Sequence, residues 1–130
     1  MTQFGWSYGF FRQRFCLCLC ASVIGLFFSG CHAERRKSDA ELGLNPQQAA
    51  GRRLYDQHCD RCHEPYSSSD KNGPALQGLF RRPYMKASGL PANDARTIEI
   101  ILYGRSKMPA FGQVLDQQQV DDLMAYLHTL

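Results

Sequence analysis

Several features that mark common protein classes are missing from this 130-residue sequence. Only one C-x-x-C pair exists, at Cys59 and Cys62, so a zinc site built from two such pairs is excluded. No segment shows sustained alternation of apolar and polar residues, which argues against a β-sheet protein. The apolar run from Phe15 to Phe28 is too short to span a bilayer.

An excess of one charge is also missing. The chain has 15 Lys and Arg residues against 12 Asp and Glu residues, a formal net charge of +3. Arg12 and Arg14 precede the apolar run, and without residues 1–30 the remainder has 13 basic and 12 acidic residues. The basic residues are scattered, so the composition gives no argument for a nucleic-acid partner.

The N-terminal residues predict export. Two arginines, a short apolar run and the small residues Ser29 and Gly30 form the pattern of a secretory signal peptide. The segment Phe28 to Cys31 resembles the lipobox of bacterial lipoproteins, in which the cysteine is lipidated and becomes the first mature residue. That family usually has leucine at the position of Phe28, and cleavage of an ordinary signal peptide after Ala33 is the alternative. We therefore expect a signal peptide over residues 1–30 and a periplasmic protein anchored to a membrane through Cys31.

This assignment accounts for all six cysteines. Cys16, Cys18 and Cys20 lie in the segment that would be removed, and Cys31 would carry the lipid. Only the C-x-x-C pair remains in the folded part, so no second pair is left for a structural disulfide.

The rest of the chain divides into a charged tether over residues 31–45 and one domain over residues 46–130. Leu42 and Leu44 show too little apolar periodicity for the tether to bury a face. Asn45 and Gln48 form a capping box for a helix from Pro46 to about Gln57.

Two further helices are predicted, and the fold class is all-α. Asn93 caps a helix from Asp94 to Tyr103 that Gly104 ends, and its expected buried face comprises Ala95, Ile98, Ile101 and Leu102. The last helix begins at a capping box formed by Asp116 and Gln119, and Leu115 and Val120 form a hydrophobic staple. Its apolar stripe comprises Val120, Leu123, Met124, Leu127 and Leu130. The Gly and Pro positions between Glu64 and Leu90 predict loops.

Cys59 to His63 spell C-x-x-C-H, the pattern by which a c-type haem is attached. Two thiols at this spacing each form a thioether to one vinyl group of the porphyrin, and the following histidine reaches the iron. A thioredoxin-like redox pair and half of a zinc site are the rival interpretations of a bare C-x-x-C. The export pattern favours haem, because c-type haem is joined to proteins outside the cytoplasm.

Residues 46–130 resemble a class I cytochrome c, similar to the small bacterial and photosynthetic carriers. Gly51 and Tyr55 in the first helix, and Leu123 and Tyr126 in the last, stand at the spacings with which that family crosses its terminal helices. Small three-helix domains have marginal cores, which fits a fold built around a large apolar cofactor. The resemblance implies one covalent haem c.

The resemblance also implies the remaining site residues. The Gly73-Pro74-Ala75-Leu76 segment is similar to the family's loop in which the proline carbonyl accepts a proton from the axial imidazole. Met108, followed by Pro-Ala-Phe, resembles the family's sixth iron ligand, opposite His63. Met85 lies in a loop without that context, and Met124 is expected in the core. His58 and His128 would be ligands only in a bis-histidine variant.

These features predict a lipid-anchored single-electron carrier that performs no chemistry on a substrate. Its haem would be packed by Leu76, Leu79, Phe80, Ile101 and Phe111. Redox proteins are the expected partners, and the protein would be a monomer or an enzyme-associated subunit. Two alternatives stay open, namely a haem-c subunit of a membrane dehydrogenase or oxidase, and a peroxidase or gas-binding protein whose iron has a free position.

Overall fold

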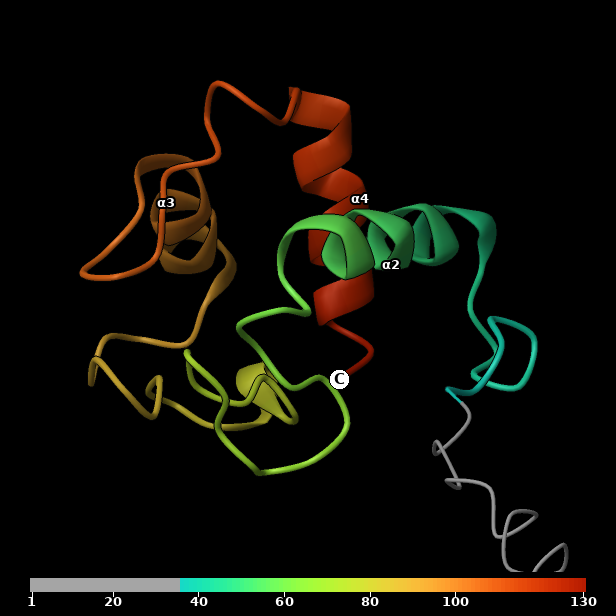
Figure 1. The fold of residues 1–130 in the computed structure, drawn as a ribbon, viewed down its shortest axis with the longest axis horizontal. Coiled ribbons are helices and arrows are strands. Elements are labelled where there is room, and N and C mark those ends of the chain that lie inside the picture. Colours follow the sequence, from blue (N-terminus) through green and yellow to red (C-terminus); the bar gives the residue numbers. More distant parts are fainter. Residues whose placement is uncertain (1–35) are drawn as a thin grey trace, which may run out of the picture. The chain divides into compact units, whose positions relative to one another are not determined.

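The computed structural model describes residues 36–130, of which Lys37–Leu130 form one compact unit. Three α-helices, α2 (Pro46–His58), α3 (Asp94–Tyr103) and α4 (Gln117–Leu127), are joined by loops, with a short 3-10 helix η1 (Leu79–Arg81) between α2 and α3 (Figure 1). Residues 36–130 contain no β-strand and only two isolated β-bridges. The all-α prediction is confirmed. The predicted signal peptide and Cys31 lie outside the described residues.

The helices begin where the local sequence predicts. Asn45 and Gln48 exchange side-chain to backbone hydrogen bonds of 2.9 and 3.0 Å at the start of α2. Asp116 and Gln119 do the same at the start of α4, with distances of 2.8 and 2.9 Å. The side chain of Asn93 accepts a hydrogen bond from the amide of Arg96 at the start of α3. Each cap stabilises its helix by about 1 kcal/mol, because it satisfies backbone donors that have no partner inside the helix.

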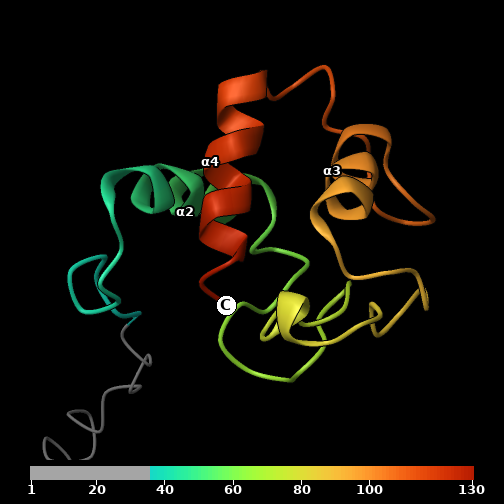
Figure 2. The ribbon, with the colours of Figure 1, turned by 180° about the vertical axis from the view of Figure 1, so that it is seen from behind.

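Helices α2 and α4 cross each other in close contact (Figures 1 and 2). Gly51 lies at the crossing, where a Cβ atom would stand 1.8 Å from the carbonyl oxygen of Asp122. Beside it, the rings of Tyr55 and Tyr126 pack edge to face with centroids 5.3 Å apart, and both side chains are fully buried. The predicted crossing of the terminal helices is therefore confirmed, with glycine allowing the backbones to approach and two aromatic rings filling the space around them.

The core lies along α4. The staple residues Leu115 and Val120 are buried, and so is Met124, as predicted from its place in the apolar stripe. The buried core cluster comprises Tyr55, Ile101, Leu115, Val120, Leu123, Met124, Tyr126, Leu127 and Leu130.

The folded unit begins at Lys37, before the predicted domain boundary at Pro46. Residues 38–44 form hydrogen-bonded turns, and Leu42 and Leu44 are half-buried. Asp39 forms an ion pair of 2.6 Å with Arg52, a buried residue of α2 that also donates to the carbonyl oxygen of Lys37. A buried guanidinium needs such partners, because an unpaired charge is costly to remove from water. These contacts hold residues 37–39 against α2.

One helical face differs from the prediction. In α3, Ala95 is exposed, whereas Thr97 is buried. The Thr97 hydroxyl donates to the carbonyl oxygen of Asn93 at 2.8 Å, which satisfies it inside the protein. Within residues 36–130, no helix is long and apolar enough to cross a membrane.

Candidate functional site

All five residues predicted to hold a cofactor line one cavity of about 730 Å³, a size typical of ligand sites. The C-terminal end of α2 and the following turn contribute Cys59, Cys62 and His63, the next loop contributes Pro74, and the loop after α3 contributes Met108. Side chains from α3 and α4 complete the wall. The fold therefore brings together residues that are up to half the domain apart in sequence.

The ring of His63 has a defined orientation. Its Nδ1 lies 2.8 Å from the carbonyl oxygen of Pro74. A carbonyl oxygen only accepts hydrogen bonds, so Nδ1 carries the proton, and Nε2 of the neutral ring has a free lone pair. The backbone of His63 is also held, because the hydroxyl of Tyr55 donates to its carbonyl oxygen at 2.8 Å.

Gly73 gives this ring its space. A Cβ atom at this position would lie 2.6 Å from Cε1 of His63, a distance that side chains do not tolerate. The Gly73 amide donates to the carbonyl oxygen of Cys62 at 2.8 Å, so the loop is fixed against the C-x-x-C-H turn. Gly73 and Pro74 together thus fix the orientation of the His63 ring and of its Nε2.

The two cysteines are free thiols in the structure and half-buried. Burial raises the pKa of the Cys59 thiol to about 11, with the neighbouring Cys62 and Asp60 adding to the effect. At neutral pH this thiol is therefore protonated and a weak nucleophile. Within residues 36–130, no group of three or more His, Cys, Asp or Glu side chains is placed to hold a metal ion.

The loop that carries Met108 is fixed to the end of α3. The amides of Phe111 and Gly112 donate to the carbonyl oxygens of Ile101 and Leu102 at 2.9 and 3.0 Å. Gly104 ends α3 with φ of +74°, and a Cβ atom there would lie 2.7 Å from the carbonyl oxygen of Met108. Only glycine adopts this conformation without strain, so Gly104 allows the chain to turn back and place the methionine at the cavity.

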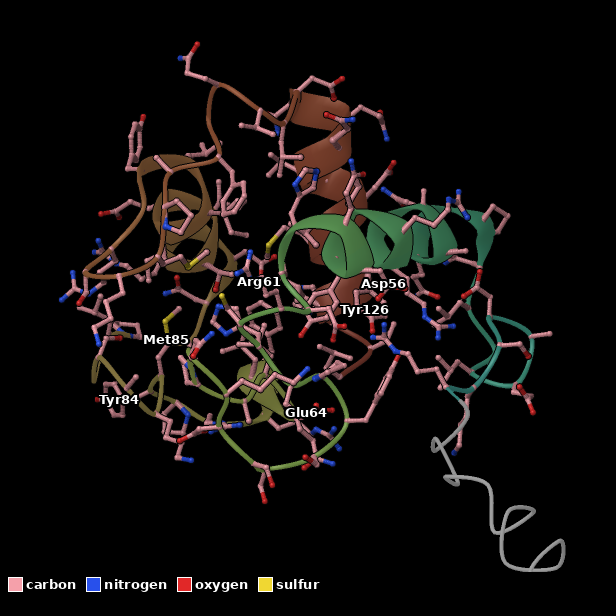
Figure 3. The ribbon with its side chains drawn as sticks, in the orientation of Figure 1. Asp56, Arg61, Glu64, Tyr84, Met85 and Tyr126 are labelled. Atoms are coloured by element: carbon pink, nitrogen blue, oxygen red, sulfur yellow. The ribbon has the colours of Figure 1, made fainter. Side chains whose placement is uncertain are left out.

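Of the other methionines and histidines considered as iron ligands, two line the cavity and two do not. Met85 also lines the cavity, and Figure 3 shows it turned inward while its neighbour Tyr84 projects outward. His58 lines the cavity too and packs edge to face on Phe111 at 5.8 Å. His128 is exposed, and its Nε2 forms a hydrogen bond of 2.9 Å with the carboxylate of Asp94. Met124 lies in the core, not in the cavity wall.

The wall is mainly apolar, and four of the five predicted packing residues belong to it, namely Leu76, Leu79, Ile101 and Phe111. Phe80 is not among the lining residues and instead stacks on His128, with centroids 4.0 Å apart. A helix-period pattern does not resolve the direction of one side chain in a single 3-10 turn, so this residue was misplaced by sequence reasoning. The sequence analysis also did not single out the cations at the cavity mouth, Arg82, Lys86, Arg105 and Lys107.

This donor set fits a haem c. An apolar cavity suits the porphyrin, two thiols at the C-x-x-C spacing suit its vinyl groups, and an imidazole nitrogen with a thioether sulfur suits its iron. Cys59, Cys62, His63 and Met108 would hold the group, and Pro74 would orient the histidine. A small all-helical fold with such a site defines a c-type cytochrome.

The comparisons with known proteins agree with this class. Residues 46–127 match the family described as cytochrome c oxidase, cbb3-type, subunit III, and the chain belongs to this family. It is also similar to the Cbb3-type cytochrome c oxidase subunit CcoP of Azospirillum sp. (strain B510), with 29% identity over 101 residues. The aligned region covers 72% of this chain and 34% of that protein, so the chain spans about a third of its relative. Membership of a c-type cytochrome family implies haem c as the cofactor.

Proposed function

We propose that this chain transfers single electrons through one covalently attached haem c, with His63 and Met108 as axial ligands. The observation that carries the proposal is the hydrogen bond between His63 and Pro74, in a cavity that Cys59, Cys62 and Met108 also line. This bond fixes the tautomer in which Nε2 is the free ligand atom. Haem c, when bound, supplies an iron that changes its oxidation state by one electron.

The side chains around the site define its properties. Met108 would contribute a soft, neutral sulfur, which favours ferrous iron and raises the reduction potential relative to a second histidine. The apolar wall, including Leu76, Ile101 and Phe111, excludes water, so little reorganisation would accompany a change of charge. With two axial ligands the iron would have no free position for a substrate, which is why the proposal assigns no catalytic residue.

Covalent attachment is tested by expressing the protein with haem-attachment machinery and staining a denaturing gel for haem. The stain should appear at the mass of the wild-type protein and be absent when Cys59 and Cys62 are both changed to alanine. Acid and organic solvent should not extract the haem. An unstained wild-type band, or a stained double variant, would reject the proposal.

A fixed electron-transfer subunit is favoured over a freely diffusing carrier. The supporting observation is the family, since its members are described as an oxidase subunit and the relative carries the same description. Mild detergent solubilisation of native membranes, followed by affinity purification of the tagged chain, tests this role. A stoichiometric oxidase or dehydrogenase partner is expected, and recovery of the chain alone would support the diffusing carrier.

The proposed location is the periplasmic face of a membrane, with Cys31 as a lipidated anchor. The pattern of Ser29, Gly30 and Cys31 after a short apolar run supports this. Several acyl chains on one residue hold a protein stably on a bilayer, whereas a single chain does not. Mass spectrometry of the mature N-terminus should find a lipidated cysteine, and a Cys31→Ala variant should stay unprocessed. An unmodified N-terminus released into the periplasm would exclude the anchor.

A further inference from the structure

The Lys, Arg, Asp and Glu side chains that line the cavity are all basic. Arg82, Lys86, Arg105 and Lys107 line the cavity, and no Asp or Glu of the described residues does. Residues 37–130 contain eleven basic and eleven acidic residues, so charged residues taken at random would hold both signs equally. The domain is neutral as a whole, and its cavity mouth is positive.

Two of these cations are engaged within the domain and two are not. The Nε of Arg82 donates to the carbonyl oxygen of Gly78 at 3.1 Å, and Nζ of Lys86 contacts both carboxylate oxygens of Asp70 at 2.9 Å. The side chains of Arg105 and Lys107 are exposed and form no hydrogen bond or ion pair with residues 36–130. These two charges are therefore available to a partner.

The turn that carries them is rigidly built. The amide of Arg105 donates to the carbonyl oxygen of Met108 at 3.1 Å, and the amide of Met108 donates back at 2.9 Å. Ser106, in the middle of the turn, has a left-handed backbone conformation with φ of +54°. The loop projects from the domain beside α3 (Figures 1 and 2). Both cations thus stand on a preformed outward turn whose backbone is bonded to the proposed iron ligand.

The surroundings of this turn resemble the surface of a protein interface. The side chain of Tyr103 is 77% exposed at the end of α3, and Pro109 and Ala110 after the turn are exposed as well. Tyrosine and arginine are enriched at interfaces, where an aromatic ring supplies apolar contact and a cation supplies orientation.

We propose that Tyr103, Arg105 and Lys107 form a docking site for an acidic surface of the redox partner, rich in Asp and Glu side chains. The proposal rests on the proposed function, because docking here would bring the partner next to Met108. Opposite charges steer association and act mainly on its rate and its salt dependence. A membrane surface is not favoured, since electrostatic binding to anionic lipid takes a cluster of several cations and this turn carries two.

The first test measures binding directly on the reduced holoprotein. Hexaglutamate is added to isotopically labelled protein, and backbone amide shifts are followed by nuclear magnetic resonance. Shifts should concentrate on residues 103–110 and disappear in Arg105→Gln/Lys107→Gln. The control Arg53→Gln/Lys37→Gln, which removes the same two residue types from exposed positions outside the cavity, should keep them. Shifts that are absent, scattered, or equally weakened in the control would overturn the proposal.

The second test uses small redox ions of opposite charge. The rate constant for reduction by hexacyanoferrate(II) should fall as ionic strength rises, and the Arg105/Lys107 variant should react several-fold more slowly with a weaker salt dependence. With the cation hexaammineruthenium(II), the rate constant should rise with ionic strength, and the Arg105/Lys107 variant should react faster than the wild type. If the variant changes the reduction potential while leaving these salt dependences intact, the two cations neutralise the carboxylates of the haem itself, and the docking proposal fails. Failure of the proposed function would be seen earlier, as protein without covalent haem.

Discussion

At the scale of single residues, the site depends on how His63 is held. Pro74 fixes which nitrogen carries the proton, Tyr55 holds the backbone, and Gly73 leaves room for the ring. These three neighbours determine the direction of the His63 ring and the basicity of its Nε2, the proposed ligand atom. Changes at any of them should therefore alter the properties of the iron without removing the haem.

Gly73→Ala tests this arrangement. The new Cβ would lie 2.6 Å from Cε1 of His63, so the ring or the loop must move. We expect a loss of about 1–3 kcal/mol in the free energy of unfolding and a shifted reduction potential. The control is Gly43→Ala, in a turn with no atom within 4 Å of the added carbon but with φ of +65°, which should cost about 1–2 kcal/mol and leave the potential unchanged. Equal potentials for Gly73→Ala and the wild type would contradict the assignment.

Tyr126 predicts a pH dependence. Its side chain is fully buried and its hydroxyl lies 2.7 Å from that of Tyr66, and burial, followed by this hydrogen bond, raises its pKa well above 10.0. The unfolded chain ionises this phenol near its ordinary pKa, whereas the folded chain keeps it neutral. Stability from this residue is therefore complete below pH about 10 and is lost above it, by about 1.4 kcal/mol per pH unit.

Tyr126→Phe isolates that effect. Near pH 9 the variant should be less stable than the wild-type holoprotein by about 1 kcal/mol, because it lacks the hydrogen bond to Tyr66. By about pH 11 urea denaturation should find this difference cancelled or reversed, since only the wild type loses stability through the phenol. A difference that stays constant between the two pH values would show that Tyr126 does not titrate in this way.

At the scale of elements, helix starts are predictable because their signals are local. Asn45, Asn93 and Asp116 each satisfy donors within three residues, so sequence neighbours decide the outcome. The buried face of α3 was predicted only in part. Thr97 is buried because its hydroxyl donates to the carbonyl oxygen of Asn93, whereas the exposure of Ala95 depends on packing between elements. The direction of Phe80 was not predictable for the same reason.

The crossing of α2 and α4 can be tested with Gly51→Ala. Alanine favours a helix intrinsically, yet its Cβ would lie 1.8 Å from the carbonyl oxygen of Asp122, so the helices must separate. We expect a loss of about 3 kcal/mol in the free energy of unfolding, measured by urea denaturation, together with a poor yield of holoprotein. Arg53→Ala, on an exposed position of the same helix, should change stability by no more than about 0.5 kcal/mol. A stabilised Gly51→Ala protein would refute the close approach.

At the scale of the whole molecule, the domain is larger than its sequence pattern suggests. Residues 37–45 read as a charged tether, because turns without apolar periodicity give no sign of packing. The sign of packing is Arg52, a buried arginine of α2 whose partner Asp39 is 13 positions away in the sequence. Likewise, the C-x-x-C-H motif and the methionine context pointed to residues that line one cavity in the structure, whereas the sign of charge at that cavity emerges only when separate loops meet.

Asp39→Ala tests the contribution of this segment. The change leaves the guanidinium of Arg52, a side chain 8% exposed, without its carboxylate partner. We expect a loss of about 1–3 kcal/mol in the free energy of unfolding and faster proteolysis of residues 37–44. The comparison is Glu99→Ala, which removes an exposed ion pair with Arg96 on α3 and should cost about 0.5 kcal/mol. Equal losses in the two variants would mean that the segment adds nothing beyond a surface contact.

The central claim is the ligand set of the iron, and one measurement tests it most directly. The oxidised holoprotein should show the long-wavelength sulfur-to-iron charge-transfer band of His/Met ligation. Met108→Ala should abolish the band, lower the reduction potential and let carbon monoxide bind the reduced protein rapidly, while Met85→Ala and Met124→Ala should retain the band. A band that survives in Met108→Ala, or one that is lost in Met85→Ala, would contradict the account, because Met85 lines the same cavity and would then be the ligand.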